Sequence, residues 1–302
     1  MNGILVIDKP AGLTSHDVVN RVRRILKERS VGHLGTLDPS ATGVLPLVIG
    51  SLTRLAQFYS TSEKAYEGVI RFGFATDTYD ADGEAVGTPQ SVAPTLDKVR
   101  QIAAGFRGFV EQMPPPFSAK KIQGVPAYKL ARKHKDVVLK PVRVEIKEFE
   151  IVNVEGECAS FRARVSAGTY LRSVAHDMGQ QLGCGAHLQS LRRTAVAEFE
   201  LADAHPLEAL QTAASGGTLE EVLIHPRKIL PSLPSVTANE DMAGHIRSGR
   251  TVNLPEFSKA QQVKVFLGQR ELIAIATRVA GTLFHARIVL VGEPSKQAAL
   301  DR

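Results

Sequence analysis

The stretch GHLGTLDPSATGVLPLVIG, residues 32–50, is the most informative part of this 302-residue chain. Gly32, Gly35 and Gly43 allow tight turns and let a ligand approach the backbone closely. Asp38 stands directly before Pro39, and the position before a proline favours extended geometry, which holds the carboxylate out of a helix. Such an aspartate on its own is usually a turn residue. The pattern therefore predicts a glycine-rich loop that presents one carboxylate and leads into an apolar stretch.

The composition, with 43% hydrophobic and 23% charged residues, is ordinary for a soluble globular protein and excludes disordered, collagen-like and disulfide-rich chains. The longest apolar run, 44–49, is far shorter than the roughly 20 residues that cross a membrane. The opening MNGILVIDKP does not resemble a signal peptide. We therefore expect a cytoplasmic protein with no membrane association.

The two cysteines, Cys158 and Cys184, form no CxxC pair. His176 and His187 lie near Cys184, but the spacings match no zinc template. We predict no metal site and two inert thiols in a reducing cytoplasm.

The formal net charge of +6 is concentrated in one segment. Residues 117–143 contain eight basic residues and one acidic residue, Asp136, which gives a local charge of +7. The basic residues are Lys120, Lys121, Lys129, Arg132, Lys133, Lys135, Lys140 and Arg143. A solvated helix face is the simpler explanation of such a run. We favour contact with the phosphate backbone of a nucleic acid, because the segment follows a proline-rich turn and the two charge signs do not alternate.

Apolar periodicity predicts separate strands and helices. We expect strands at 3–7, 64–74, 142–154, 159–166 and 195–201, and helices at 53–59, 96–106 and 171–182. A further helix contains Val18, Val19, Val22, Ile25 and Leu26 at helical spacing, and either Thr14 or Ser15 can cap it. Residues 76–87 form an acidic loop. This order indicates an α+β fold rather than alternating βαβ units.

A linker is expected at 229–235, where two prolines disfavour a helix. Strands at 263–267, 272–279 and 283–291 follow it. The chain thus divides into a larger domain, 1–232, and a small β-rich domain, 233–302.

Residues 32–45 resemble the pattern G-H-x-G-x-L-D-P-x-A-T-G-x-L of the bacterial tRNA pseudouridine-55 synthases, the TruB family. Further segments resemble the same family in the same order. They are DKPAGLTS (8–15), KAYEG (64–68), TDTYDADG (76–83), GTYLRSVAHDMG (168–179) and CGAHLQSLRRTAVAEF (184–199). The resemblance covers about residues 3–210, and the part after 235 resembles a PUA domain more loosely.

The resemblance implies a pseudouridine synthase fold with a mixed, largely antiparallel sheet and a central cleft. Residues 117–143 would be a thumb-like insertion that closes on RNA, and the PUA-like domain would bind farther along the tRNA. The implied reaction converts uridine 55 of the T-loop to pseudouridine: the N-glycosidic bond breaks, the uracil rotates, and carbon 5 bonds to the ribose. No redox change occurs, so no cofactor is expected.

The resemblance also implies roles for three catalytic residues. Asp38 acts as a nucleophile or stabilises an oxocarbenium-like ribose, and attack on the sugar, attack on the base and a glycal route all stay open. Arg172 opposes this carboxylate with a bidentate fork, which stabilises its charged form. Tyr66 stacks on the base and acts on a ribose proton.

A stacked uridine has to be flipped out before it can react. The resemblance makes His33 the ring that fills the gap, although a histidine bonded to the loop backbone is the alternative. Leu191 packs beneath the base or is a core leucine. Lys9 and Pro10 support the active-site loop, and Tyr170 contacts the base side. Lys129, Arg132 and Lys133 are the expected phosphate contacts.

Two other functions are compatible with these patterns. One is an isomerase guided by a separate RNA and partner proteins, and the other is a non-catalytic chaperone of tRNA folding. The basic insertion and the C-terminal part favour a stand-alone, monomeric enzyme that binds the T-stem-loop of tRNA without an obligatory protein partner.

Overall fold

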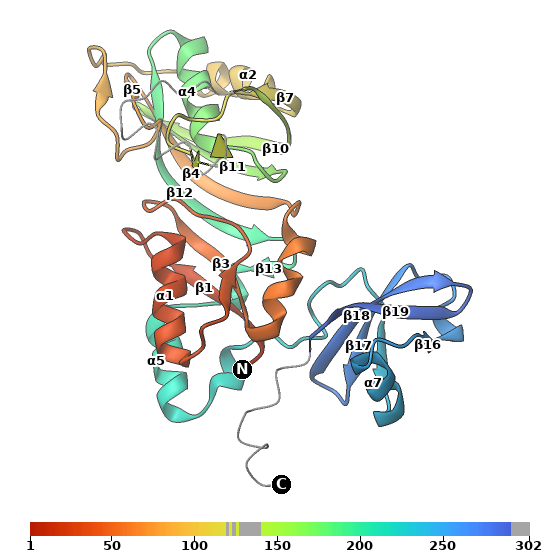
Figure 1. The fold of residues 1–302 in the computed structure, drawn as a ribbon. Helices are drawn as coiled ribbons and strands as arrows, with labels where there is room; N and C mark the ends of the chain where they lie inside the picture. The colour runs from red at the N-terminus through yellow and green to blue at the C-terminus, as the bar shows by residue number, and fades with distance from the viewer. Residues whose placement is uncertain (119–120, 123–124, 127–139, 291–302) are drawn as a thin grey trace.

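The structure, a computed structural model, describes residues 1–118, 121–122, 125–126 and 140–290 (Figure 1). Its largest element is a ten-stranded sheet with the order β14-β1-β3-β12-β4-β11-β10-β7, in which β2 also pairs with β3 and β13 with β12. The strands are β1 (Gly3–Lys9), β2 (Val31–His33), β3 (Thr42–Ile49), β4 (Lys64–Phe72), β7 (Gly108–Gln112), β10 (Val142–Glu155), β11 (Cys158–Val165), β12 (Ala186–Val196), β13 (Phe199–Glu200) and β14 (Ala204–His205). In this sheet β1–β14 and β3–β12 are parallel and the other pairs are antiparallel. The predicted mixed α+β fold is confirmed.

Helices cover one face of this sheet. Helices α2 (Leu96–Ala104) and α4 (Leu171–Leu182) lie over one half, and α1 (Ser15–Leu26) and α5 (Leu207–Gly216) over the other (Figure 1). All four contribute buried side chains to one apolar core. The long strand β12 runs through both halves and joins them (Figure 1). Strand β12 therefore connects the half of the sheet under α2 and α4 with the half under α1 and α5.

The first strand is apolar throughout because both of its faces are buried. Leu5 and Ile7 face the helices, whereas Ile4 and Val6 face a second core. This second core also contains Leu55 of η1 (Gly50–Tyr59), a 3-10 helix on the opposite face of the sheet. Such two-sided burial explains why an uninterrupted apolar run forms this strand.

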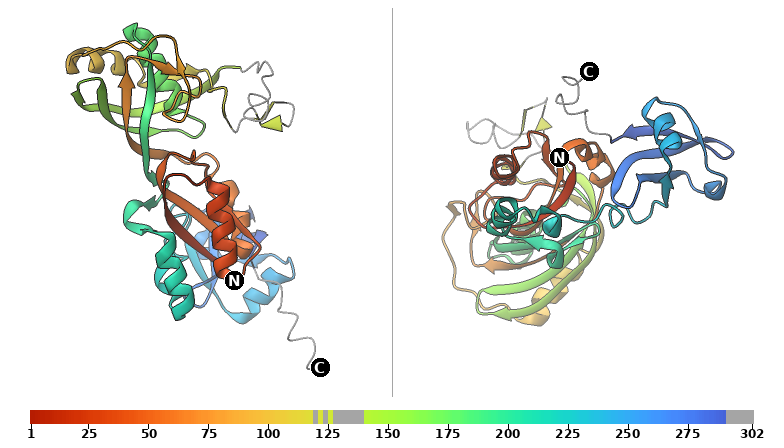
Figure 2. Two further views of the ribbon diagram at one scale, coloured as in Figure 1. Left: turned by 90° about the vertical axis from the view of Figure 1, so that its left-hand side faces the viewer. Right: turned by 90° about the horizontal axis from the view of Figure 1, so that it is seen from below.

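The C-terminal part forms a five-stranded sheet with the order β15-β17-β18-β19-β16. Its elements are β15 (Ser235–Ala238), α7 (Glu240–Arg247), β16 (Val252–Asn253), η3 (Pro255–Phe257), β17 (Gln262–Leu267), β18 (Glu271–Ala280) and β19 (Leu283–Val289). The three predicted strands are confirmed; β15, β16 and α7 were not predicted. Phe266 and Ile275 pack into the core that contains η1, so this part lies against the large sheet, as the view from below in Figure 2 shows.

The linker expected at 229–235 begins with two buried residues, Ile229 and Leu230. Ile229 is fully buried, and the buried Lys264 of β17 donates from Nζ to the Ile229 carbonyl at 2.6 Å. Glu198 accepts hydrogen bonds from the Leu230 backbone N–H at 2.8 Å and from the Tyr59 hydroxyl at 2.6 Å. These bonds fix the connection to both sheets.

Most predicted elements are confirmed, with small shifts of their ends. Thr14 rather than Ser15 caps α1, since its side chain accepts from Asp17 N while Asp17 accepts from Thr14 N. The acidic loop 76–87 is bounded by a short hairpin, β5 (Ala75–Thr76) and β6 (Ala85–Val86). The remaining short elements are β8 (Lys121–Ile122), β9 (Val125–Pro126), η2 (Leu201–Asp203) and α6 (Leu219–Val222).

In the middle of the sheet one predicted strand was misplaced and one strand was not predicted. The strand expected at 195–201 is broken at Ala197, whose φ of 49° turns the chain between β12 and β13. The main strand lies earlier, at Ala186–Val196, where polar residues obscure the alternation. The apolar stretch that follows the loop, to which no element was assigned, forms strand β3 at residues 42–49, because pairing with β1 outweighs the presence of Gly43 and Pro46.

The basic segment lies largely outside the described residues, and this includes Lys129, Arg132 and Lys133. The strands that flank it are neighbours at one edge of the sheet, where Gln112 of β7 pairs with Val142 of β10. Within the described part of the chain, no helix is long and apolar enough to cross a membrane.

Candidate active site

The loop that contains Asp38 connects β2 to β3, and a buried lysine of β1 donates a hydrogen bond to its backbone. Lys9 is fully buried, and its Nζ donates to the carbonyls of Pro10 at 2.9 Å, Leu13 at 2.7 Å and Pro39 at 3.0 Å. Burial lowers the pKa of Lys9 to about 8. An ammonium group has three N–H donors, and these bonds use all of them. Lys9 thus supports the loop and has no donor left for RNA, while Pro10 is exposed.

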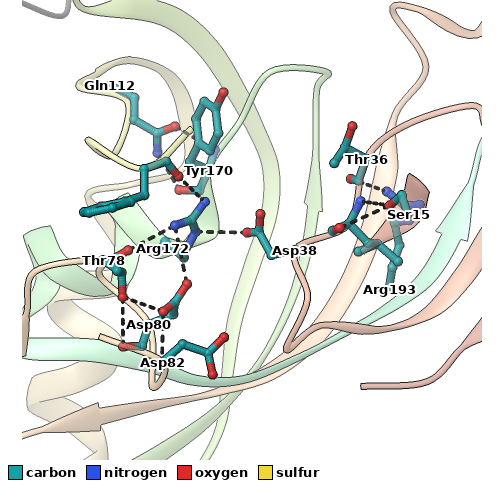
Figure 3. Close-up of polar contacts among 12 residues, drawn as sticks. Ser15, Thr36, Asp38, Thr78, Asp80, Asp82, Gln112, Tyr170, Arg172 and Arg193 are labelled. Carbon is teal, nitrogen blue, oxygen red and sulfur yellow. Dashed lines mark hydrogen bonds and ion pairs between the residues drawn. The ribbon is translucent and has the colours of Figure 1, made fainter. Parts of the chain in front are cut away.

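A second buried cation holds the same loop from the sheet. Arg193 of β12 has no exposed surface, and it donates to the carbonyls of Val44 at 2.8 Å, Thr36 at 3.2 Å and Gly35 at 3.0 Å. The first residue of α1, Ser15, closes the loop from another side, since its Oγ accepts from Leu37 N at 2.8 Å. Figure 3 shows Asp38 between this anchored segment and Arg172. The sequence analysis missed Arg193, because nothing in the pair Arg192–Arg193 shows which one is buried.

Arg172, in the first turn of α4, contacts Asp38 directly, and both residues line the same cavity. Its side chain is 6% exposed, and Nε lies 3.0 Å from Asp38 Oδ2. The other two nitrogens donate elsewhere, Nη1 to the carbonyl of Thr78 at 3.1 Å and Nη2 to that of Phe117 at 2.9 Å. The expected bidentate fork on Asp38 is therefore wrong. One guanidinium instead joins the Asp38 loop, the acidic loop and the start of the basic segment.

Asp80 is a second carboxylate on Arg172, and the sequence analysis missed it as well. Its Oδ2 lies 3.4 Å from Nη1 of Arg172, and its Oδ1 accepts from the Thr78 hydroxyl at 2.6 Å. Burial raises the pKa of Asp80, and the Thr78 hydroxyl and Arg172 oppose this effect. Tyr79, which lies between Thr78 and Asp80 in the sequence, has a φ of 66°. Its ring stacks on that of His176, with the ring centroids 3.8 Å apart. The only sequence signal was the acidic loop itself, which contains several aspartates.

Asp38 and Arg172 both line a cavity of about 280 Å³. The residues that line it include Asp38, Lys64, Tyr66, Tyr170, Arg172 and Leu191. Tyr66 of β4 is 8% exposed, and its burial raises the pKa of the hydroxyl, while the neighbouring charge of Arg193 lowers it in part. Asp38 is the more accessible member of the ion pair, with a side chain that is 40% exposed. The cavity thus combines an accessible carboxylate with an aromatic ring.

Tyr170 is positioned by a buried amide. Gln112 of β7 donates from Nε2 to the Tyr170 carbonyl at 3.0 Å, and its Oε1 accepts from Tyr170 N at 2.8 Å. Gln112 is 3% exposed, and Figure 3 shows it beside Tyr170. The edge strand therefore fixes the residue that precedes α4.

His33, at the end of β2, is bonded to its own loop. Its Nδ1 accepts from Gly35 N at 3.3 Å, and burial lowers the pKa of the imidazole. This contact is the backbone alternative that the sequence left open, and the insertion of the ring into an RNA stack stays a prediction.

Two family models together match residues 23–230, the part of the chain that contains this cavity. The N-terminal domain of the TruB family pseudouridylate synthases matches residues 23–171, and the C-terminal domain of tRNA pseudouridylate synthase B matches residues 172–230. The chain belongs to the TruB family. Asp38, Tyr66 and the loop with Asp80 fall within the first TruB match, and Arg172 begins the second.

TruB relatives match along almost the whole chain. The tRNA pseudouridine synthase B of Solibacter usitatus is 49% identical over 96% of this chain and 100% of its own length. That of Aquifex aeolicus is 39% identical over 96% of this chain and 100% of its own length.

Solved structures show the same fold at lower identity. A structure of an H/ACA RNP bound to a substrate RNA containing 2′-deoxyuridine has a TM-score of 0.70 and 24% identity, and the match covers 96% of this chain and 85% of that one. The structure of an archaeal box H/ACA sRNP Nop10-Cbf5 complex has a TM-score of 0.68 and 24% identity, and the match covers 96% of this chain and 86% of that one. The TruB chain therefore has the pseudouridine synthase fold.

Proposed function

We propose that this chain is a tRNA pseudouridine-55 synthase that converts one uridine of the T-loop to pseudouridine. The main support is the accessible Asp38 carboxylate, paired with the buried Arg172, in a cavity suited to one nucleoside. Family membership gives the reaction class, and the names of its curated relatives give tRNA as the substrate. The buried Lys9 and Arg193 support the loop from two sides, so Asp38 is held ready before RNA binds.

In this proposal Asp38 is the group that acts on the flipped uridine. A carboxylate can attack a glycosidic carbon or stabilise a cationic ribose, and it can also attack the base or take part in a glycal route. Arg172 orients the carboxylate by its contact through Nε at 3.0 Å. All three routes share the need for an ionised Asp38 close to the base and the sugar.

Tyr66 and Leu191 line the cavity on the sheet side and are proposed to sandwich the uracil. Because burial raises its pKa, the Tyr66 hydroxyl is protonated near neutral pH and can donate a hydrogen bond to the sugar or base. Transfer of a ribose proton to Tyr66 would then require a change in its protonation during the reaction. Tyr170 is proposed to contact the base from the opposite wall.

The uridine has to leave its stack to reach this cavity. His33 is proposed to fill the vacated space, which requires it to exchange its bond to Gly35 for stacking. The basic segment 117–143, with Lys129, Arg132 and Lys133, is proposed to close on the phosphates as a thumb. We also propose that residues 1–232 form the catalytic domain and residues 233–302 a PUA-like RNA-binding domain.

The enzyme is proposed to work alone, as a cytoplasmic monomer. The test is to incubate the purified protein with an unmodified tRNA transcript, without other components, and to map pseudouridine. The expected result is one modified uridine, at position 55. Modification that requires an added guide RNA or partner protein would favour the guided isomerase, and tRNA refolding without modification would favour a chaperone.

A further inference from the structure

Lys64 lines the cavity with Asp38 and Tyr66 but has no part in the arrangement described above. It begins β4, two residues before Tyr66, and alternate residues of a strand point to the same face. Its Nζ donates to the Ser62 carbonyl at 2.8 Å, and no second acceptor for it lies among the described residues. Two of the three N–H donors of the ammonium group are therefore available to another ligand.

The charge of Lys64 is poorly compensated in the free protein. Burial and the nearby Arg193 lower its pKa to about 8, and in the described part of the chain no carboxylate counteracts them. Lys9 and Arg172, by contrast, are saturated by carbonyls or carboxylates. Lys64 and Arg172 thus line the cavity together with Asp38, while the buried Lys9 and Arg193 hold the backbone of the loop that contains Asp38.

Gly35 leaves space for the stem of this lysine. A Cβ at Gly35 would lie 3.2 Å from Lys64 Cε, and the φ of +132° at Gly35 disfavours any side chain. The glycine therefore leaves room for the lysine at the wall of the cavity that Asp38 also lines.

We propose that the Lys64 ammonium binds a phosphodiester that flanks the uridine in the cavity and so sets the ribose over Asp38. This inference rests on the proposed function, because it assumes that a nucleotide of RNA enters. The base and ribose of a uridine are neutral, and the phosphodiester is its only anion. A lysine with free donors binds phosphate as a point charge, and the phosphate offsets the cost of a half-buried cation.

The test combines a change in the protein with a change in the RNA. The substrate is a synthetic T-stem-loop whose phosphodiester on either side of the target uridine is replaced by a neutral methylphosphonate. With the wild-type enzyme, one replacement should raise KM about tenfold or more, in line with a lost hydrogen bond to a charged group. Lys64→Gln should cause a similar rise with the unmodified RNA, and the two changes together should add little.

Lys64→Arg keeps the charge and should bring KM most of the way back to the wild-type value. If Lys64 were only structural, arginine would not restore KM and the effect of the methylphosphonates together. Lys98→Gln, on the exposed surface of α2, is the matched control and should leave KM unchanged. A full effect of the methylphosphonates in Lys64→Gln, or no effect of either one on the wild type, would overturn the proposal.

The pH dependence gives an independent readout. A lysine binds phosphate when protonated, so the wild-type KM should rise as the pH passes about 8. Tyr66 on β4, Asp38 in the loop, and Tyr170 and Arg172 at the start of α4 also line the cavity. The buried Arg193 of β12 lies near Lys64 and lowers its pKa. Comparison with Lys64→Arg isolates the lysine, because arginine stays charged and its KM should rise less. If the wild type forms no pseudouridine in the unmodified RNA, the proposed function fails; if it does and Lys64→Gln matches it, only the role of Lys64 fails.

Discussion

Arg172 Nε lies 3.0 Å from Asp38 Oδ2, although the two residues belong to a helix and a loop that are far apart in the sequence. The same guanidinium contacts Asp80 and two carbonyls. Asp38 is therefore one member of a small network that links three segments of the chain. The network explains how a half-exposed carboxylate is kept in a defined position.

Asp38→Asn should abolish turnover and leave RNA binding largely intact. The change keeps the size of the side chain and removes its charge, whereas contacts with phosphates supply most of the affinity for RNA. Pseudouridine formation and tRNA affinity are the two measurements. Asp82→Asn, the same chemical change at an exposed aspartate, is the control. Activity within tenfold of the wild type, in a preparation free of host enzyme, would contradict a catalytic role for Asp38.

Arg172→Lys should reduce turnover strongly and affinity for tRNA much less. A lysine keeps the charge but cannot reach Asp38, Asp80 and two carbonyls at once, so Asp38 loses its fixed orientation. Single-turnover rates and equilibrium binding separate the two effects. Arg164→Lys, at an exposed arginine of β11 paired with Glu148, should change neither. Wild-type turnover in Arg172→Lys would show that the ion pair is unimportant.

Gly43→Ala should destabilise the protein by more than about 2 kcal/mol. Gly43 has a φ of +100°, and a Cβ there would lie 2.2 Å from the backbone oxygen of Arg193, so the parallel pairing of β3 with β12 could not form as it is. Gly156→Ala, with a φ of +57° and no atom within 4 Å, should lose only about 1–2 kcal/mol. Urea unfolding measures both. Equal losses would mean that the close approach of these strands does not matter for stability.

Replacement of Lys129, Arg132 and Lys133 by Ala should weaken tRNA binding and make its salt dependence shallower. Each lost contact with a duplex phosphate changes the slope of log affinity against log salt by about 0.9, so a change of roughly one to three units is expected. Binding measured over a salt series, with a thermal melt as a check of folding, tests this. Unchanged affinity and parallel salt plots would show that the segment is a solvated surface.

The sequence by itself determined the elements whose apolar pattern is continuous or alternates cleanly. The run GILVI at 3–7 became β1, and the alternation at 159–166 became β11. It failed at β3 and β12, where Gly43, Pro46 and the arginines 192–193 obscure the period. Local patterns cannot show that long-range pairing overrides such residues.

The sequence also contained the family motif around Asp38, because that string is local. Which cations meet that loop was decided by the tertiary structure. Arg193 and Asp80 look like surface residues in the sequence, and they are buried only because β12 and the acidic loop fold onto the site. Nor could the sequence show that Arg172 divides its donors among several acceptors, since the geometry of a guanidinium contact depends on where distant backbone carbonyls lie. The motif thus identified the chemistry, and long-range packing decided which charged groups are buried around it.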